Sequence, residues 1–233
     1  MADFTFAHRE EGFDDHIEHS IRGYSHLLDD IVGYSRYFVE NGTNVVDIGC
    51  STGKVTQRLL EENQDHGNDA RYVGVEVAEG FFDNLDIRKE EISEEHPWAS
   101  LDFVKGDIRN YKFENCSLVT SVFTLQFMSP RHRREVLTQI YKGLNYGGAF
   151  IFAEKTVCED PRLQDMMTFN YYDYKRKNFT TEDIMDKERT LRHMMKPNTW
   201  KELNSNLNLS GFSFDQIQPF WRNHMFVGAI AIK

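Results

Sequence analysis

Apolar residues follow a helical period near the N-terminus and change to short β-branched runs further along the chain. Between residues 14 and 40 they recur at helical spacing, with a break at Gly23-Tyr24-Ser25. From residue 44 onward, apolar runs alternate with helical patterns, and the runs fall at residues 45–48, 72–76, 101–104, 118–123 and 149–154. This alternation predicts right-handed βαβ units and a parallel sheet with helices on both faces.

The alternation stops at residues 160–198, which have a helical pattern rich in Met, Tyr and charged residues. We predict that this segment forms a helical insert or cap before the last strands. A helix at 198–207 and two strands at 214–219 and 225–232 then close the chain, the strands as an antiparallel hairpin at the sheet edge. The pattern therefore predicts one α/β domain over residues 1–233, with a mostly parallel, seven-stranded sheet. Its parts are N-terminal helices at 14–43, a sheet core at 44–155, the insert at 160–198 and the closing helix and strand pair at 199–233.

Composition limits the partners and the compartment. The chain has 233 residues and a net charge of -10, and this balance argues against strong direct nucleic-acid binding, which needs a basic surface. The three cysteines, Cys50, Cys116 and Cys158, form no Cys-x-x-Cys pair and are typical of a reducing compartment. No apolar run reaches the roughly 20 residues of a membrane span. Because residues 1–11 also lack the pattern of a signal peptide, we expect a cytoplasmic protein without a membrane partner.

The strongest chemical signal is the segment Asp47-Ile-Gly49-Cys50-Ser51-Thr-Gly53, between the first predicted strand and a helix. Glycines at such a turn let the backbone approach a ligand and enter a helix whose first amides face that ligand. By itself, the segment is equally compatible with an ordinary tight turn.

Two acidic residues at the ends of the next strands favour a nucleoside site. Glu76 ends the second strand, where Rossmann-type proteins place a carboxylate that accepts ribose hydroxyls. Asp107 follows the third strand, where its carboxylate could accept from an adenine amino group. Ser51 replaces the central glycine of a dinucleotide loop, which favours a nucleoside without pyrophosphate. With Gly147-Gly148 before the fifth strand, these residues resemble the Rossmann-like class I methyltransferase fold, and they indicate S-adenosylmethionine (SAM) or S-adenosylhomocysteine as the ligand.

Longer stretches resemble the carboxy-S-adenosylmethionine (carboxy-SAM) synthases from about residue 13 to the C-terminus. They are Ser20-Ile-Arg-Gly-Tyr-Ser25, Phe123-Thr-Leu-Gln-Phe127, residues 140–148, Ala153-Glu-Lys155 followed by Glu159-Asp160, and Asp173-Tyr-Lys-Arg176. The resemblance implies a homodimer with a helical insert near the active site. It also implies conversion of SAM and prephenate into carboxy-SAM, which a partner enzyme uses to modify wobble uridine in tRNA. The cofactor contacts that it implies are Tyr24, Gly49, Cys50, Ser51, Glu76, Val77, Asp107 and Ile108, and we expect Asp47, Gly53 and Val122 to complete the cofactor site.

The sequence departs from that family at three positions of the expected site. Val122 and Val77 stand where the family has amide side chains, and valine offers no hydrogen-bonding group. The family also has an arginine in the insert that holds the extra carboxylate of the product. A one-residue deletion near Asn178 would put Glu188 at that position, whereas a later deletion would put Arg189 there as the carboxylate clamp. A deletion within a helix rotates every following side chain, which favours the alignment with Glu188.

These departures lead us to expect a methyltransferase acting on a small or medium acceptor, with no general base assigned. A carboxy-SAM synthase with Arg189 as the clamp is the alternative, and a non-catalytic SAM-binding partner subunit is a second alternative. For other groups we favour ordinary roles: surface positions for the histidines and the arginine run, and either pocket or dimer packing for the aromatic and methionine residues of the insert. We expect no metal site. These groups are His8, His16, His19, His26, His132, Arg131, Arg133, Arg134, Met166, Met167, Tyr171, Tyr172 and Tyr174.

Overall fold

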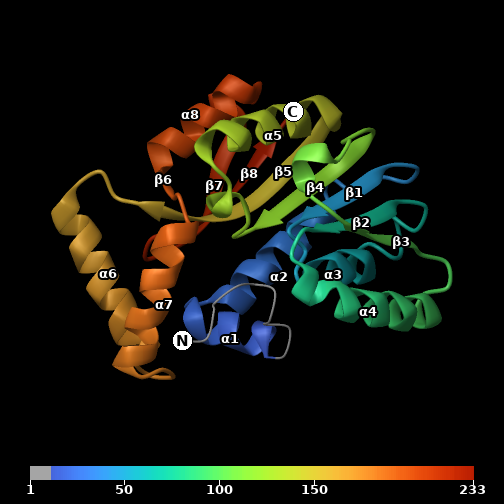
Figure 1. The fold of residues 1–233 in the computed structure, drawn as a ribbon. Coiled ribbons are helices and arrows are strands. Elements are labelled where there is room, and N and C mark those ends of the chain that lie inside the picture. Colours follow the sequence, from blue (N-terminus) through green and yellow to red (C-terminus); the bar gives the residue numbers. More distant parts are fainter. Residues whose placement is uncertain (1–11) are drawn as a thin grey trace.

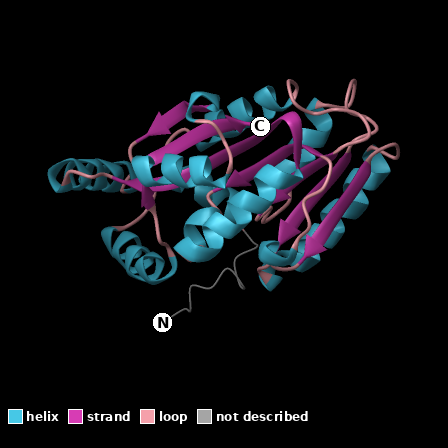
Figure 2. Ribbon diagram, turned by 90° about the horizontal axis from the view of Figure 1, so that it is seen from above, coloured by secondary structure: helices cyan, strands magenta, loops and turns pink. Residues whose placement is uncertain are grey.

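A computed structural model describes residues 12–233, in which an open sheet lies between two layers of helices (Figures 1 and 2). The strand order is β3-β2-β1-β4-β5-β8-β7, and the two-residue strand β6 pairs with β5 off this path. Strands β1 to β5 run parallel, while β8 is antiparallel to both β5 and β7. The strands are β1 (Asn44–Ile48), β2 (Arg71–Glu76), β3 (Ser100–Lys105), β4 (Cys116–Val122), β5 (Leu144–Val157), β6 (Asn198–Thr199), β7 (Ile217–Asn223) and β8 (Phe226–Ile232). The predicted α/β sheet with its closing antiparallel hairpin is confirmed.

Side chains that alternate along the strands bury two separate cores. In β1, Val45 packs on one face of the sheet with helices α2 (Tyr24–Ser35) and α3 (Lys54–Glu62). Val46 points to the opposite face, against α5 (Pro130–Gly143) and α8 (Trp200–Ser210). Helix α4 (Phe82–Glu95) contacts β3 at the edge of the sheet. Because both faces are covered, the parallel strands carry near-continuous apolar runs, as the sequence does.

The predicted break in the N-terminal helical pattern separates two helices. Helix α1 (Phe13–Ser20) ends shortly before Gly23, which is the N-cap residue of α2 and has a φ of 75°. This left-handed conformation costs a glycine little, so the chain can change direction there. The turn brings α1 beside the carboxyl ends of the strands, where it forms one wall of the site described below.

The insert is a pair of helices, α6 (Pro161–Lys175) and α7 (Thr181–Met194). The Asp160 side chain caps α6 by accepting from two backbone N–H groups, and Thr180 forms a capping box with Asp183 at the start of α7. The two helices extend away from the sheet in both views (Figures 1 and 2). The predicted helical insert is therefore present and well capped.

Two predicted boundaries differ from the structure. Strand β5 begins at Leu144 and reaches Val157, because its start pairs with Cys116 of β4 and its end pairs with β8 and β6. The sequence pattern placed a turn before residue 149 because it could not show these pairings. At the other end, Phe214 belongs to a short 3-10 turn that precedes β7, and not to the strand itself.

Candidate cofactor and substrate site

A cavity of about 670 Å3 lies at the carboxyl ends of β1, β2 and β4 and continues to the insert. Its lining includes every residue predicted to contact the cofactor except Gly53. These residues are Tyr24, Asp47, Gly49, Cys50, Ser51, Glu76, Val77, Asp107, Ile108 and Val122. Gly53 instead caps α3 at a φ of 77°, and an added Cβ there would meet the Phe103 ring at 2.8 Å. Close packing of this turn against Phe103 therefore explains why residue 53 is a glycine.

The loop after β1 is held in a left-handed conformation at two positions. Gly49 has a φ of 65°, and a Cβ at this position would lie 2.4 Å from the side chain of Thr124. Ser51 has a φ of 52°, which is uncommon for a residue with a side chain. Its backbone N–H then donates to Glu76 Oε2 over 2.8 Å. The strained loop thus connects the end of β1 to the end of β2.

Glu76 is buried, and backbone groups fix its carboxylate. Besides Ser51, the N–H groups of Val77 and Ala78 donate to Oε1 over 2.9 and 2.8 Å. Burial raises the pKa of Glu76, while these three N–H donors act in the opposite direction. A carboxylate can accept about four hydrogen bonds, so Glu76 retains capacity for the ribose hydroxyls of a ligand. The residues present therefore fit an adenosyl group.

Asp47 lies at the end of β1 and lines the cavity, and its contact with a cofactor stays a prediction. Its carboxylate accepts from the hydroxyls of Thr56 and Thr120 over 2.9 and 2.8 Å. These bonds connect β1 to α3 and to β4 beneath the loop. Burial raises the pKa of Asp47 to about 6, with the two threonines opposing the shift. Although Asp47 lines the cavity, its hydrogen bonds mainly brace the loop.

Asp107 and Ile108 lie at the turn after β3. The Asp107 carboxylate accepts from the backbone N–H of Arg109 over 2.9 Å and from its Nε over 2.8 Å. The Arg109 guanidinium also lowers the pKa of Asp107. Contact between Asp107 and an adenine amino group stays a prediction.

The aromatic part of the site is formed by Tyr24 and Phe123. Tyr24 starts α2 and is buried, with its ring centroid 6.2 Å from that of Phe123. Burial raises the pKa of Tyr24, and Asp14 adds to the shift. Phe123 has a φ of 56° directly after Val122, so the chain turns sharply at the end of β4. Phe123 lines the cavity but is not among the predicted cofactor contacts, although it begins the motif Phe123-Thr-Leu-Gln-Phe127.

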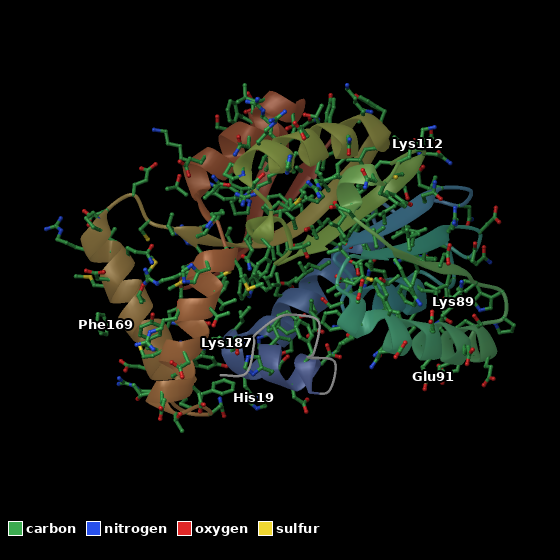
Figure 3. All side chains as sticks on the ribbon, viewed as in Figure 1. His19, Lys89, Glu91, Lys112, Phe169 and Lys187 are labelled. Carbon is green, nitrogen blue, oxygen red and sulfur yellow. The ribbon has the colours of Figure 1, made fainter. Side chains whose placement is uncertain are left out.

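The insert end of the cavity carries lysines that sequence reasoning did not assign. Lys155 of β5, Lys175 of α6 and Lys187 of α7 all line it. Lys187 contacts the ring nitrogen of His16 on α1, and Figure 3 shows it between the two helices. Two of these lysines fall in the motifs Ala153-Glu-Lys155 and Asp173-Tyr-Lys-Arg176. The sequence feature that could have identified Lys155 and Lys175 is the motif that contains each of them. Periodicity predicts a strand or a helix, but it does not show which charged residue faces a cavity.

Arg189 does not face the cavity. Its side chain is 80% exposed and pairs with Asp186 over 3.1 Å. Glu188 instead is buried, with Oε1 3.8 Å from the Nζ of Lys155. The expectation that Arg189 acts as a carboxylate clamp is thus at odds with the structure, because α7 is rotated so that position 188 points inward.

The prediction of a solvated arginine run is wrong for one residue. Arg131 is exposed, but Arg133 is buried and donates to the carbonyl oxygens of Leu125, Met128 and Lys196 over 2.9, 3.0 and 2.7 Å. A guanidinium has enough donors to bind several carbonyls at once, which a surface helix pattern cannot reveal. Arg133 therefore fixes the turn after β4.

Glu154 holds the same turn from the other side. Its Oε1 accepts from the Leu125 N–H over 3.0 Å, and burial raises the pKa of Glu154 to about 8. Arg133 opposes this shift.

Other groups weighed in the sequence contribute no recognisable metal centre. Within residues 12–233, no three His, Cys, Asp or Glu side chains are grouped so that they could hold a metal ion, and His8 lies outside this range. In the same range, every helix is too short or too polar to cross a membrane.

Comparison with known proteins assigns the chain to a family. Residues 45–148 match the family described as a methyltransferase domain. The chain is 32% identical over 235 residues to the carboxy-S-adenosyl-L-methionine synthase of Shewanella sediminis, covering 100% of this chain and 94% of that protein. Identity to the enzyme of the same name from Shewanella oneidensis is 34%, with 100% and 94% coverage. For the Staphylococcus epidermidis enzyme the values are 33%, 95% and 92%.

Solved structures show the same fold at low sequence identity. An O-methyltransferase family protein from Burkholderia thailandensis matches with a TM-score of 0.66 and 14% identity, covering 98% of this chain and 61% of that one. Human N-acetylserotonin methyltransferase, solved in complex with SAM, matches with a TM-score of 0.59 and 16% identity, covering 90% and 52%. The chain thus spans only about half to three-fifths of these two proteins. The chain has the Rossmann-like class I methyltransferase fold, and its relatives match it over nearly their whole length. It therefore belongs to the carboxy-S-adenosyl-L-methionine synthase family of SAM-dependent transferases.

Proposed function

We propose that the protein is a carboxy-SAM synthase, with prephenate as the second substrate that the sequence resemblance implies. The observation that carries this proposal is the extent of the similarity, because relatives of that name align with the whole chain. The aligned region includes α6 and α7, which wall one end of the cavity. This full-length similarity outweighs the departures at Val77, Val122 and Glu188, which had favoured conventional methyl transfer.

The cofactor end of the cavity would bind and orient the adenosyl group. Glu76, held by three backbone N–H groups, is placed to accept the ribose hydroxyls. Tyr24 and Phe123 exclude water beside it. When bound, SAM would supply the sulfonium methyl carbon, which would exchange one proton for the carboxyl group that prephenate loses, and the protein would contribute mainly position and charge.

The insert end of the cavity has the charge that this reaction requires. Carboxy-SAM and prephenate both carry carboxylates, which a cationic wall stabilises. Lys155, Lys175 and Lys187 provide such a wall, so the proposal does not depend on Arg189.

Mass spectrometry of small molecules released by denaturing the freshly purified protein tests the proposal. We expect carboxy-SAM in the extract, and its formation when the protein is incubated with SAM and prephenate. Release of SAM or S-adenosylhomocysteine alone, with no carboxy-SAM formed on incubation, would refute the synthase assignment.

Methyl transfer to a small acceptor is the second candidate, and Val122 favours it. This apolar side chain lines the cavity at the end of β4, where the family has an amide. Accumulation of S-adenosylhomocysteine with a panel of acceptors, without carboxy-SAM, would identify this activity. A non-catalytic SAM-binding subunit would bind S-adenosylhomocysteine but turn over nothing with either set of substrates.

We further propose a homodimer and a cytoplasmic location. The outward side of α6 presents Leu163, Met166 and Phe169, spaced three residues apart and exposed, the last two at 66% each. A second copy of the chain is the partner that the resemblance implies. All three cysteines are free thiols, in keeping with a reducing compartment. In the cytoplasm, a separate enzyme would use the carboxy-SAM to modify tRNA.

A further inference from the structure

Among the described residues, the insert end of the cavity carries only positive charge, whereas the cofactor end carries both signs. Near the ends of β1, β2 and β3, the lining includes the acids Asp47, Glu76 and Asp107 and the cations Lys54 and Arg109. The lining residues from β5, α6 and α7 include Lys155, Lys175 and Lys187 and, within the described chain, no acid. An elongated ligand or a pair of ligands would therefore meet mixed charges at the cofactor end and, from the residues that the structure describes, only ammonium groups at the insert end.

Lys175, which is buried, and Lys155, which is largely buried, converge on one aromatic ring. Lys175 is 2% exposed, and the side chain of Lys155 is 12% exposed. Their Nζ atoms lie 5.7 and 5.3 Å from the centroid of the Tyr171 ring. The ring face stabilises a cation, but it supplies none of the oxygen acceptors that an ammonium group can use.

Among residues 12–233, Glu188 is the one carboxylate that acts on the charges of both lysines. Glu188 Oε1 lies 3.8 Å from the Lys155 Nζ, which is beyond hydrogen-bonding distance, and among residues 12–233 this oxygen has no hydrogen-bond partner. Burial lowers the pKa of both lysines, while Glu188 favours their charged forms. Two buried ammonium groups facing one carboxylate leave an excess of positive charge, and an anion in the cavity would compensate for it.

We infer that Lys155 and Lys175 form a subsite for the carboxylate of a second small molecule, a carboxylic acid with an apolar or aromatic body that binds beside the cofactor. The apolar body is expected because Ile17, Leu191, Met195 and Phe226 line the same cavity. The inference deepens the proposed function, and rests on it only for the premise that a second reactant shares this cavity.

The carboxylate of the cofactor's own amino-acid group is the competing source of negative charge. The predicted cofactor contacts lie on the loops after β1 to β4 and on Tyr24, whereas the two lysines come from β5 and α6. This separation favours the second molecule.

Calorimetric titration of the full-length protein saturated with S-adenosylhomocysteine tests the subsite. The probes are 3-phenylpropionate and its neutral amide, which have the same ring and differ in charge, with prephenate as a second acid. The variants are Lys155→Met and Lys175→Met, which keep an unbranched side chain, and Lys175→Arg, which keeps the charge. Lys177→Met is the matched control, because it removes one exposed lysine two residues further along the chain.

We expect the wild type and Lys177→Met to bind the acids at least about tenfold more tightly than the amide. Each methionine variant should lose this preference, Lys175→Arg should retain most of it, and the affinity for S-adenosylhomocysteine should stay within about twofold, which also shows that the variants fold.

Equal binding of acid and amide by the wild type would overturn the inference. So would a loss of S-adenosylhomocysteine affinity in the methionine variants, since the lysines would then serve the cofactor's carboxylate. A failure of the proposed synthase activity would leave these titrations unchanged, so the two ideas fail separately.

Discussion

The carboxylate of Glu76 is fixed before any ligand arrives, because three of its hydrogen bonds go to backbone N–H groups. Both oxygens therefore act as acceptors, which makes the charged form essential to the geometry. Replacement by glutamine would turn an N–H2 group towards a backbone donor. We expect Glu76→Gln to weaken S-adenosylhomocysteine binding by about 10- to 100-fold and to lower the melting temperature. The exposed Glu79→Gln variant should leave both unchanged, and equal affinities in calorimetry would contradict this role for Glu76.

Glu154 gives a second prediction for a single residue. Its pKa is raised to about 8 by burial, against an ordinary value of 4.5. Between these pH values the unfolded state has lost the proton and the folded state keeps it, so the free energy of unfolding falls as pH rises. This group contributes up to about 1.4 kcal/mol per pH unit, and Glu154→Gln should remove that slope between about pH 5 and 8. Urea titrations across this range measure it.

Comparison of three proteins isolates the contribution of Glu154. The wild type and an exposed control, Glu94→Gln, should lose stability in parallel, while the Glu154→Gln curve stays flatter. Parallel curves for all three would show that Glu154 is ionised in the folded protein.

Among the elements, the loop after β1 depends on a close contact with the segment after β4. A Cβ on Gly49 would lie 2.4 Å from Thr124, and the φ of 65° adds strain, so Gly49→Ala is expected to destabilise the protein by about 2–4 kcal/mol. Gly42→Ala is the matched control, since its φ is 71° but nothing lies within 4 Å of an added Cβ. It should cost only about 1–2 kcal/mol, the penalty of the left-handed conformation. Equal losses in denaturant titrations would show that the Thr124 contact is unimportant.

Combining Gly49→Ala with Thr124→Ala should restore part of the lost stability, since the alanine lacks the two atoms that lie at 2.4 Å.

The sequence predicted the elements better than the orientation of their side chains. Strand ends and the loop around Gly49 and Glu76 follow from local pattern, and their residues do meet in one cavity. Lys175 and Arg133 could not be placed, because a helical pattern shows that a helix exists but not which charged residue faces inward. The rotation of α7, with Glu188 inward and Arg189 outward, agrees with the alignment at Glu188 that the sequence favoured over Arg189.

For the whole molecule, the exposed apolar residues of α6 lead to a prediction about assembly. Figure 3 shows Phe169 pointing away from the rest of the protein. If this surface pairs two copies, size-exclusion chromatography with light scattering will show a wild-type dimer, and Phe169→Glu will be monomeric because a charge is costly in an apolar interface. Leu209→Glu, at a similarly exposed apolar residue on α8, is expected to remain dimeric. A monomeric wild type at micromolar concentration would argue against the homodimer.

The bonds of Arg133 have a consequence for the route by which a ligand enters. Lys196, whose carbonyl accepts from Arg133 over 2.7 Å, directly follows the end of α7 and Met195. Swinging α7 outward at this point would leave a buried guanidinium short of acceptors. Helix α1 has weaker attachments, including a 3.1 Å hydrogen bond between Thr52 and Asp14 and the contact of His16 with Lys187. We therefore expect the amides of α1 to exchange hydrogen quickly and to slow when S-adenosylhomocysteine binds, while those near Lys196 exchange slowly throughout. A ligand would then enter the cavity when α1 moves outward, while α7 of the insert stays in place.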